Sequence, residues 1–144
     1  MSTQDQEAAE VNEEPATLPV DPKETEKAGK KLAQALVSQS ISVVVCWDKA
    51  EDAVLAHVVA RELGVPVCYA YESGGIMGLE SRLPAGASTA LVSDVFRHQN
   101  DLAGLAGVVT NSGYTVAAVA TRRPGVSAED TTAAKAISLV YLGR

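Results

Sequence analysis

The chain has 144 residues, about the length of one domain, and carries 12 Lys and Arg against 18 Asp and Glu, a formal net charge of −6. The acidic excess lies in residues 1–27, whereas residues 28–144 hold equal numbers of acids and bases. This balance argues against a nucleic-acid-binding protein, which needs a basic surface to displace counterions from phosphates. No apolar run approaches the roughly 18 residues of a membrane-spanning helix, so we expect no membrane partner either.

The two cysteines, Cys46 and Cys68, both lie in apolar runs. They make no disulfide framework, and the N-terminus is unlike a signal peptide, so we expect a cytoplasmic protein. No Cys or His spacing is typical of a zinc site, and we predict no metal-ligating residue.

Two regions differ in composition. Residues 1–20 are rich in Glu, Gln, Ala and Pro without apolar periodicity, which predicts an acidic disordered tail. Residues 21–144 read as one α/β domain. It begins with a helix, because Asp21 is an N-cap residue, Pro22 suits the first helical position and Glu24 completes a capping box. Leu32 and Leu36 lie on one face of that helix, which we expect to end near residues 38–40.

After this helix, strand and helix patterns alternate. Residues 41–46 form a β-branched apolar run, typical of a strand buried on both faces. Residues 50–63 have helical spacing and stop at Gly64, a good helix-ending residue. Residues 65–71 are a second strand, for which Pro66 indicates an edge position. A glycine-rich loop at 72–86 follows. The remaining predicted elements are strands at 87–93, 115–120 and 137–142 and helices at 100–111 and 127–136.

Five short buried strands alternating with helices predict a single doubly wound parallel sheet with helices on both faces, preceded by the N-terminal helix. Right-handed crossovers place the first strand between the second and the third. A ligand then binds beyond the carboxyl ends of the first and third strands, where the strand order reverses. The residues there, 46–49 and 93–99, include the only Trp and the only Phe of the chain.

The candidate ligand-binding residues come from these two loops, and no catalytic residue is predicted. Trp47 would stack on a ring, Asp94 would bind a sugar hydroxyl or cap the loop that follows it, and Arg97 with His98 would bind an anion. The alternative for Arg97 is an ion pair with Asp94 or Asp101 on a solvated loop. The full predicted set is Trp47, Asp48, Lys49, Ser93, Asp94, Arg97, His98 and Gln99.

Cys46 and His98 follow neighbouring strands, so a nucleophilic Cys–His pair is geometrically possible. A cysteine at a strand end is more often a small apolar filler.

Two stretches resemble the type I phosphoribosyltransferase family. Residues 89–101, followed by a helix and by Gly113–Val116, resemble the family's diphosphate-sugar signature, a hydrophobic strand that leads into a phosphate loop and a helix. Residues 43–67 resemble its first strand, pyrophosphate loop and second strand. The resemblance spans residues 28–144 and implies a domain like the orotate and purine phosphoribosyltransferases. Alternation alone also suits a flavodoxin-like domain.

The departures from the family pattern fall on its chemistry. Where the family has two acids that hold the ribose hydroxyls, this chain has Ser93 and Asp94. The phosphate loop at 97–101 lacks glycine and threonine, and Asp101 is expected at the N-cap of the next helix, where it competes for phosphate-binding N–H groups. The pyrophosphate loop at 47–51 lacks glycine and contains two acids.

The altered loops favour a non-catalytic protein that binds a small ligand or has a regulatory function. The alternatives are an active phosphoribosyltransferase that uses phosphoribosyl diphosphate with magnesium, and a protein-interaction module with an empty crevice. The expected partners are a small phosphorylated ligand or nucleotide and a second copy in a homodimer. Residues 74–78 correspond to the family's mobile loop, so Ile76 and Met77 would line a lid or a dimer contact. Arg122 and Arg123 are interpreted as a solvated turn.

Overall fold

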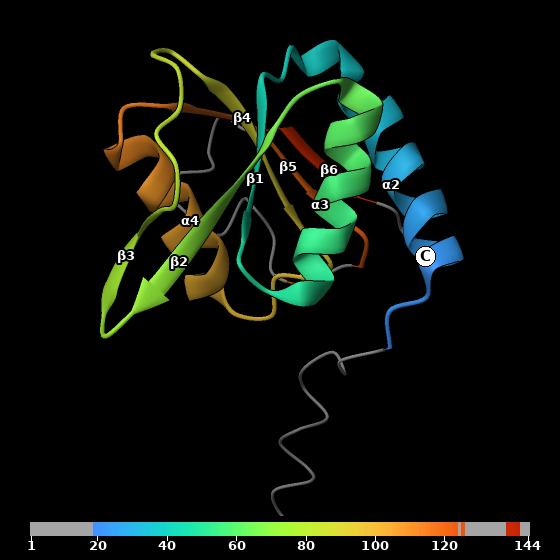
Figure 1. Cartoon of the computed structure of the whole chain (residues 1–144), viewed down its shortest axis with the longest axis horizontal. Coiled ribbons are helices and arrows are strands. Elements are labelled where there is room, and N and C mark those ends of the chain that lie inside the picture. Colours follow the sequence, from blue (N-terminus) through green and yellow to red (C-terminus); the bar gives the residue numbers. More distant parts are fainter. Residues whose placement is uncertain (1–18, 124, 126–137, 142–144) are drawn as a thin grey trace, which may run out of the picture.

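The structure, a computed structural model, describes residues 19–123, 125 and 138–141. Its centre is a six-stranded sheet in the order β3-β2-β1-β4-β5-β6 (Figure 1). The edge strand β3 pairs antiparallel with β2, and the other five strands are parallel to one another. The strands are β1 (Val43–Trp47), β2 (Val67–Ser73), β3 (Ile76–Leu79), β4 (Ser88–Ser93), β5 (Thr115–Thr121) and β6 (Ser138–Tyr141). The first strand is predicted to lie between the second and the third predicted strands, and this is confirmed, because β1 lies between β2 and β4.

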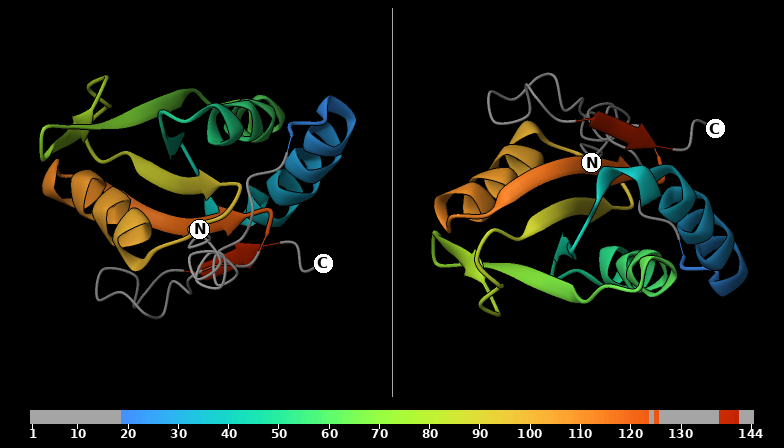
Figure 2. Two further views of the ribbon diagram at one scale, coloured as in Figure 1. Left: turned by 90° about the horizontal axis from the view of Figure 1, so that it is seen from below. Right: turned by 90° about the horizontal axis from the view of Figure 1, so that it is seen from above.

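Helices cover both faces of the sheet, so the doubly wound α/β fold is confirmed (Figure 2). Helices α2 (Pro22–Leu36) and α3 (Ala50–Leu63) cover one face, and α4 (Gln99–Asn111) covers the other. A short 3₁₀ turn, η1 (Val37–Gln39), follows α2. None of the described helices is both long and apolar enough to cross a membrane.

The position of β1 in the middle of the sheet explains why its sequence is continuously apolar. Val44 and Cys46 face the cluster formed with α2 and α3, whereas Val43, Val45 and Trp47 face the cluster formed with α4. All five residues are buried. Since neither face of the strand meets water, the alternation of polar and apolar residues that marks a half-exposed strand is absent.

The prediction that residues 72–86 are one loop is wrong. They contain β3, which forms a hairpin with β2 through a two-residue turn at Gly74 and Gly75 with φ of 59° and 83°. Two consecutive positive φ angles are typical of the turn that joins twisted antiparallel strands. The hairpin adds a sixth strand.

The edge position predicted for the second strand is also wrong, because β2 has β1 on one side and β3 on the other. Pro66 precedes the strand, and its carbonyl accepts a hydrogen bond from the Val44 N–H. Its missing N–H therefore removes no bond within the strand. The helix predicted at 127–136 and residues 1–18 of the predicted tail lie outside the described residues.

Candidate functional site

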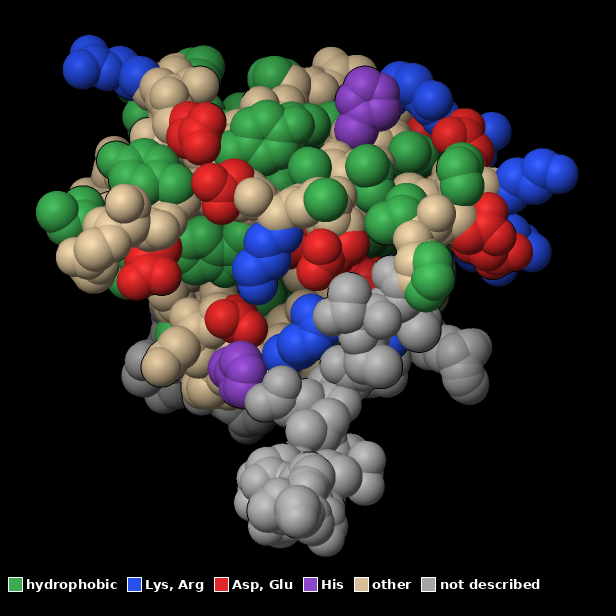
Figure 3. All heavy atoms as spheres, turned by 60° about the horizontal axis from the view of Figure 1, so that its bottom comes forward, with side chains coloured by type: hydrophobic (Ala, Val, Ile, Leu, Met, Phe, Trp, Pro, Cys, Tyr) green, Lys and Arg blue, Asp and Glu red, His purple; other side chains and the backbone are tan. Residues whose placement is uncertain are grey.

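A cleft of about 580 Å³ opens at the carboxyl end of β1, between the β2–β3 hairpin and the first turns of α4. Figure 3 shows this face of the molecule, where acidic side chains surround hydrophobic atoms. The cleft lies at the sheet edge where the sequence predicts a ligand. Its lining residues are Trp47, Asp48, Lys49, Glu72, Met77, Asn100, Asp101 and Gly104.

Trp47 connects the end of β1 to the start of α4. Its indole Nε1 donates a hydrogen bond to the Asp101 carbonyl oxygen at 2.8 Å, and its ring belongs to the buried cluster beneath α4. The chain then turns into α3, because Asp48 N–H donates to the Ala70 carbonyl and Lys49 is the N-cap residue. The indole therefore fixes one wall of the cleft while Asp48 and Lys49 remain exposed.

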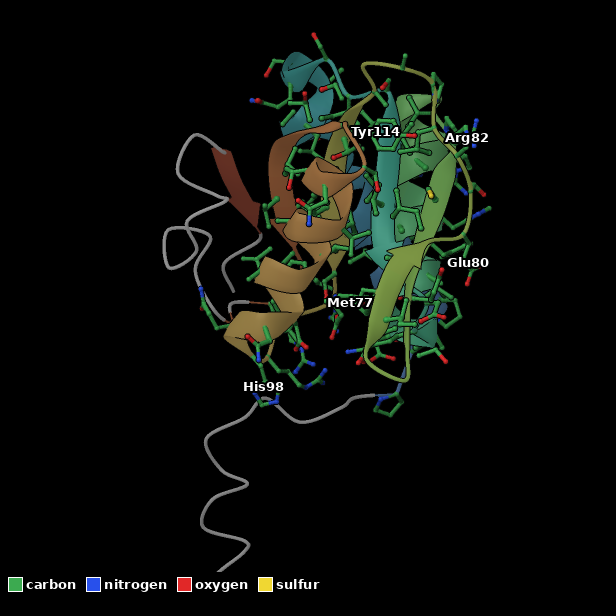
Figure 4. The ribbon with its side chains drawn as sticks, turned by 90° about the vertical axis from the view of Figure 1, so that its left-hand side faces the viewer. Met77, Glu80, Arg82, His98 and Tyr114 are labelled. Carbon is green, nitrogen blue, oxygen red and sulfur yellow. The ribbon has the colours of Figure 1, made fainter. Side chains whose placement is uncertain are left out.

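The hairpin supplies the opposite wall. Glu72 of β2 pairs with Met77 of β3, and both side chains line the cleft. Figure 4 shows Met77 between the hairpin and α4. A Cβ atom on Gly104 would lie 3.2 Å from the Met77 sulfur and 3.6 Å from Trp47 Cζ2. The missing side chain at Gly104 is therefore what leaves room between the hairpin, the indole and α4.

The charged groups that line the cleft are mostly acidic. Asp48, Glu72 and Asp101 contribute carboxylates, and Lys49 contributes the one ammonium among the lining residues. Asp101 also accepts a hydrogen bond from the His98 N–H through Oδ2 at 3.1 Å. The cleft therefore presents a negative potential to a ligand.

Asp94 lies apart from this cleft, at the end of β4, and its carboxylate is bound by two arginines. Oδ1 accepts a hydrogen bond from Arg122 Nε at 2.6 Å, and Oδ2 accepts from Arg123 Nη2 at 2.8 Å. The arginine side chains are only 28% and 21% exposed, so the interpretation of a solvated turn is wrong. They reach Asp94 because β5 ends beside β4, where the Arg123 N–H bonds the Asp94 carbonyl.

A second buried carboxylate, Asp52, lies in the first turn of α3, and no sequence pattern predicts it. Its side chain is 3% exposed, and Oδ1 accepts hydrogen bonds from the Asp94 N–H at 2.9 Å and from the Ser93 hydroxyl at 3.0 Å. Burial raises its pKa to about 6, against the opposing effect of these two hydrogen bonds. Asp52 thereby joins α3 to the loop after β4.

The predicted anion site at the start of α4 has different contacts from those expected. Arg97 pairs with Glu51 at 3.9 Å rather than with Asp94 or Asp101. The N-cap residue is His98, and Asp101 is the third helical residue, so the predicted N-cap position of Asp101 is wrong. Gln99 begins the helix, and its buried Nε2 has no hydrogen-bond partner among the described residues.

The eight predicted residues thus divide into groups. Trp47, Asp48 and Lys49 line the cleft, whereas Ser93 and Asp94 belong to the network around Asp52. Arg97, His98 and Gln99 occupy the loop before α4 and its first turn. The sequence analysis leaves Glu72 and Gly104 out of the site and considers Met77 only as part of a lid or a dimer contact, although the Gly-Gly pair is typical of the hairpin that brings Glu72 and Met77 to the cleft.

Cys46 has the features of an apolar filler rather than of a nucleophile. It is buried on the sheet face covered by α2 and α3, whereas His98 is exposed. Burial, with nearby acidic groups, raises the pKa of its thiol to about 12. A thiol with so high a pKa is protonated at neutral pH.

Comparison with known proteins identifies similar folds among solved structures. No family model and no curated protein matches the chain. Adenine phosphoribosyltransferase from Thermoanaerobacter pseudethanolicus superposes with a TM-score of 0.67 at 16% identity, over 85% of this chain and 81% of that one. Orotate phosphoribosyltransferase from Aeropyrum pernix gives a TM-score of 0.62 at 20% identity, over 79% and 70%.

A third structure is a hypothetical protein from Neisseria gonorrhoeae with bound ppGpp, with a TM-score of 0.61 at 10% identity over 84% of this chain and 80% of that one. The chain therefore has a type I phosphoribosyltransferase-like fold, as its sequence resemblance implied.

Proposed function

We propose that the protein is a phosphoribosyltransferase-like ligand-binding or regulatory protein that does not transfer a phosphoribosyl group. The observation that carries this proposal is the set of hydrogen-bond partners of the Asp94 carboxylate. In the phosphoribosyltransferase family that the sequence resembles, a carboxylate at this position binds ribose hydroxyls. In this protein the Asp94 carboxylate instead accepts hydrogen bonds from Arg122 and Arg123. These charge-assisted bonds are stronger than bonds from a neutral sugar hydroxyl, so a sugar competes poorly for Asp94.

The loops that would bind phosphates support the same proposal. A phosphate at a helix start needs backbone N–H groups that point at it and a positive local potential. The His98 N–H already donates to the Asp101 carboxylate, which also repels an anion. At the pyrophosphate loop, Asp48 and Glu51 bring negative charge beside Lys49.

Magnesium, which the resemblance implies for phosphoribosyl diphosphate binding, does not fit the residues at the end of β4. Both oxygens of Asp94 are engaged by guanidinium groups, and a divalent cation there would meet two positive charges. Within the described ranges, no group of three His, Cys, Asp or Glu side chains is arranged to hold a metal.

The first test is thermal unfolding of the whole protein with millimolar phosphoribosyl diphosphate and magnesium, together with an assay of pyrophosphate release in the presence of nucleobases. We expect no rise of the unfolding midpoint and no release. A ligand at 100 times its Kd stabilises a protein by about 2.7 kcal/mol, a shift of several degrees. A clear rise together with pyrophosphate release would overturn the proposal and restore the transferase alternative.

A nucleotide or other small phosphorylated ligand remains the sequence-based candidate for the crevice, and the same unfolding assay with AMP and ppGpp tests it. The homodimer is a separate prediction, to be checked by light scattering of the full chain. If no small ligand shifts the midpoint, the interaction-module alternative is favoured.

A further inference from the structure

The cleft beside Trp47 combines an aromatic wall, a thioether and an excess of carboxylates. Its shape and its charge are separate observations, and together they restrict the ligand. This step rests on the proposed function, since it assumes that the crevice binds a small molecule.

The apolar part of the cleft has room for a ring. Trp47 is only 8% exposed, and its indole is held in place by its bond to the Asp101 carbonyl, so a ligand meets the small exposed part of a ring that is already ordered. Met77, which is 47% exposed, contributes a flexible thioether side chain. Thioethers contact aromatic ring edges favourably and adapt to irregular shapes. Gly104 leaves open the space between them.

The charges around this space favour a positive group. Asp48 comes from the end of β1, Glu72 from the hairpin and Asp101 from α4, so carboxylates arrive from three elements and Lys49 opposes them. The nearest basic residues of the predicted anion loop are engaged elsewhere, as Arg97 pairs with Glu51.

We infer that this cleft binds a small molecule with a flat or apolar ring and a cationic nitrogen, and that it selects against phosphate-bearing ligands. The ring lies against Trp47 and Met77, and the cationic nitrogen lies among the carboxylates of Asp48, Glu72 and Asp101. The site thus has the position of a phosphoribosyl-binding crevice but the opposite charge preference.

The test uses three probes that share one ring and differ in charge, namely benzamidinium, benzamide and benzoate, with AMP as the phosphorylated probe. The chain has a single tryptophan, so its indole N–H gives one NMR resonance that reports directly on this cleft. We expect that resonance to move with millimolar benzamidinium, less with benzamide and not with benzoate or AMP. The affinity for benzamidinium should fall as salt is added, while that for benzamide should not.

Three substitutions sharpen the assignment. Glu72→Gln should weaken benzamidinium about threefold and leave benzamide unchanged, because it removes one exposed charge interaction. Glu80→Gln is the matched control, since Glu80 is exposed just beyond β3 and does not line the cleft (Figure 4). Gly104→Ala should weaken both benzamidinium and benzamide, because its Cβ fills the space between Met77 and Trp47.

The outcomes separate this inference from the proposed function. If AMP or phosphoribosyl diphosphate moves the indole resonance more than benzamidinium does, the charge preference is overturned while ligand binding stands. Equal effects of Glu72→Gln and Glu80→Gln would also overturn the charge preference. If none of the probes moves the resonance, both the inference and the proposed binding of small ligands at this crevice are overturned.

Discussion

The loops after β1 and after β4 begin at the same edge of the sheet, yet they differ in how their charged side chains are bound. The first, the open half, exposes its charged groups beside the cleft, whereas the carboxylate of the second, the closed half, is paired with two arginines. After β1, Asp48 and Lys49 are exposed, and the cleft lies between Trp47 and the hairpin. After β4, Asp94 is buried against Arg122 and Arg123. The open half can therefore bind a ligand, while the closed half stabilises the fold.

The difference teaches that the position of a carboxylate in this fold does not decide its role. A buried carboxylate costs free energy unless charges or hydrogen bonds compensate it. Asp94 is compensated by two guanidinium groups, and Asp52 by the Ser93 hydroxyl and the Asp94 N–H. These partners compensate both carboxylates within the fold. Asp94 and Arg122 also line a separate cavity of about 390 Å³, where an external ligand would have to compete with the Asp94–Arg122 ion pair.

The largest effect that would sharpen this comparison is expected from Asp94→Ala. Removing the carboxylate leaves two partly buried guanidinium groups without their shared partner, which should lower the free energy of unfolding by about 3 kcal/mol. Urea denaturation measures the change. Asp48→Ala removes an exposed carboxylate from the open half and should change stability by less than about 0.5 kcal/mol. Equal losses in the two variants would break the distinction between the halves.

Asp52→Asn tests the closed half by its pH dependence. The pKa of Asp52 is raised from 3.8 to about 6 in the folded protein, so between these pH values the folded state holds a proton that the unfolded chain has lost. The stability from this proton is complete below about pH 3.8 and disappears as the pH rises through about 6. The asparagine variant, which keeps an oxygen acceptor, lacks this decline.

Relative to Asp52→Asn, the wild-type protein should therefore lose up to about 3 kcal/mol of stability between pH 4 and pH 7. Urea denaturation at a series of pH values measures it, with Glu80→Gln as the control for an exposed acid. Parallel pH profiles for wild type and Asp52→Asn would show that burial does not perturb this group.

Glycine-to-alanine substitutions compare the halves with the same chemical change. A Cβ on Gly125 would overlap the Phe96 carbonyl oxygen, so the backbone must move, and we expect a loss of about 1–3 kcal/mol. On Gly104 the nearest atom is the flexible Met77 sulfur at 3.2 Å, and alanine favours the helix by up to about 1 kcal/mol. Gly104→Ala should therefore be neutral or stabilising in thermal unfolding. A larger loss at Gly104 than at Gly125 would contradict this account.

The smallest effect is expected at Cys46. Its buried thiol, with a pKa raised to about 12, should resist alkylation by iodoacetamide at pH 8 in the folded protein and react only after unfolding. Mass spectrometry of labelled peptides measures this. Rapid labelling of native Cys46 would restore the hypothesis of a reactive thiol at the strand end.

Much of the fold could be predicted because its signals are local. Helix α3 was expected at residues 50–63 and is observed at Ala50–Leu63, since its apolar spacing and Gly64 lie within one segment. The alternating pattern was enough to place β1 between its parallel neighbours. The β2–β3 hairpin is not predicted although its Gly-Gly turn is also local, because the glycine content of residues 72–86 is equally typical of a loop.

The sequence by itself determined the doubly wound sheet, the N-terminal helix capped by Asp21 and the edge of the sheet that carries the cleft. Only the tertiary structure decided that Asp94 binds arginines 28 and 29 residues away and that Asp52 meets Ser93 across 41 residues. The physical reason is the distance along the chain between the interacting residues. Apolar periodicity and capping act between near neighbours in the chain, whereas the charge partners that open one half of the crevice edge and close the other are brought together only when the strands pair.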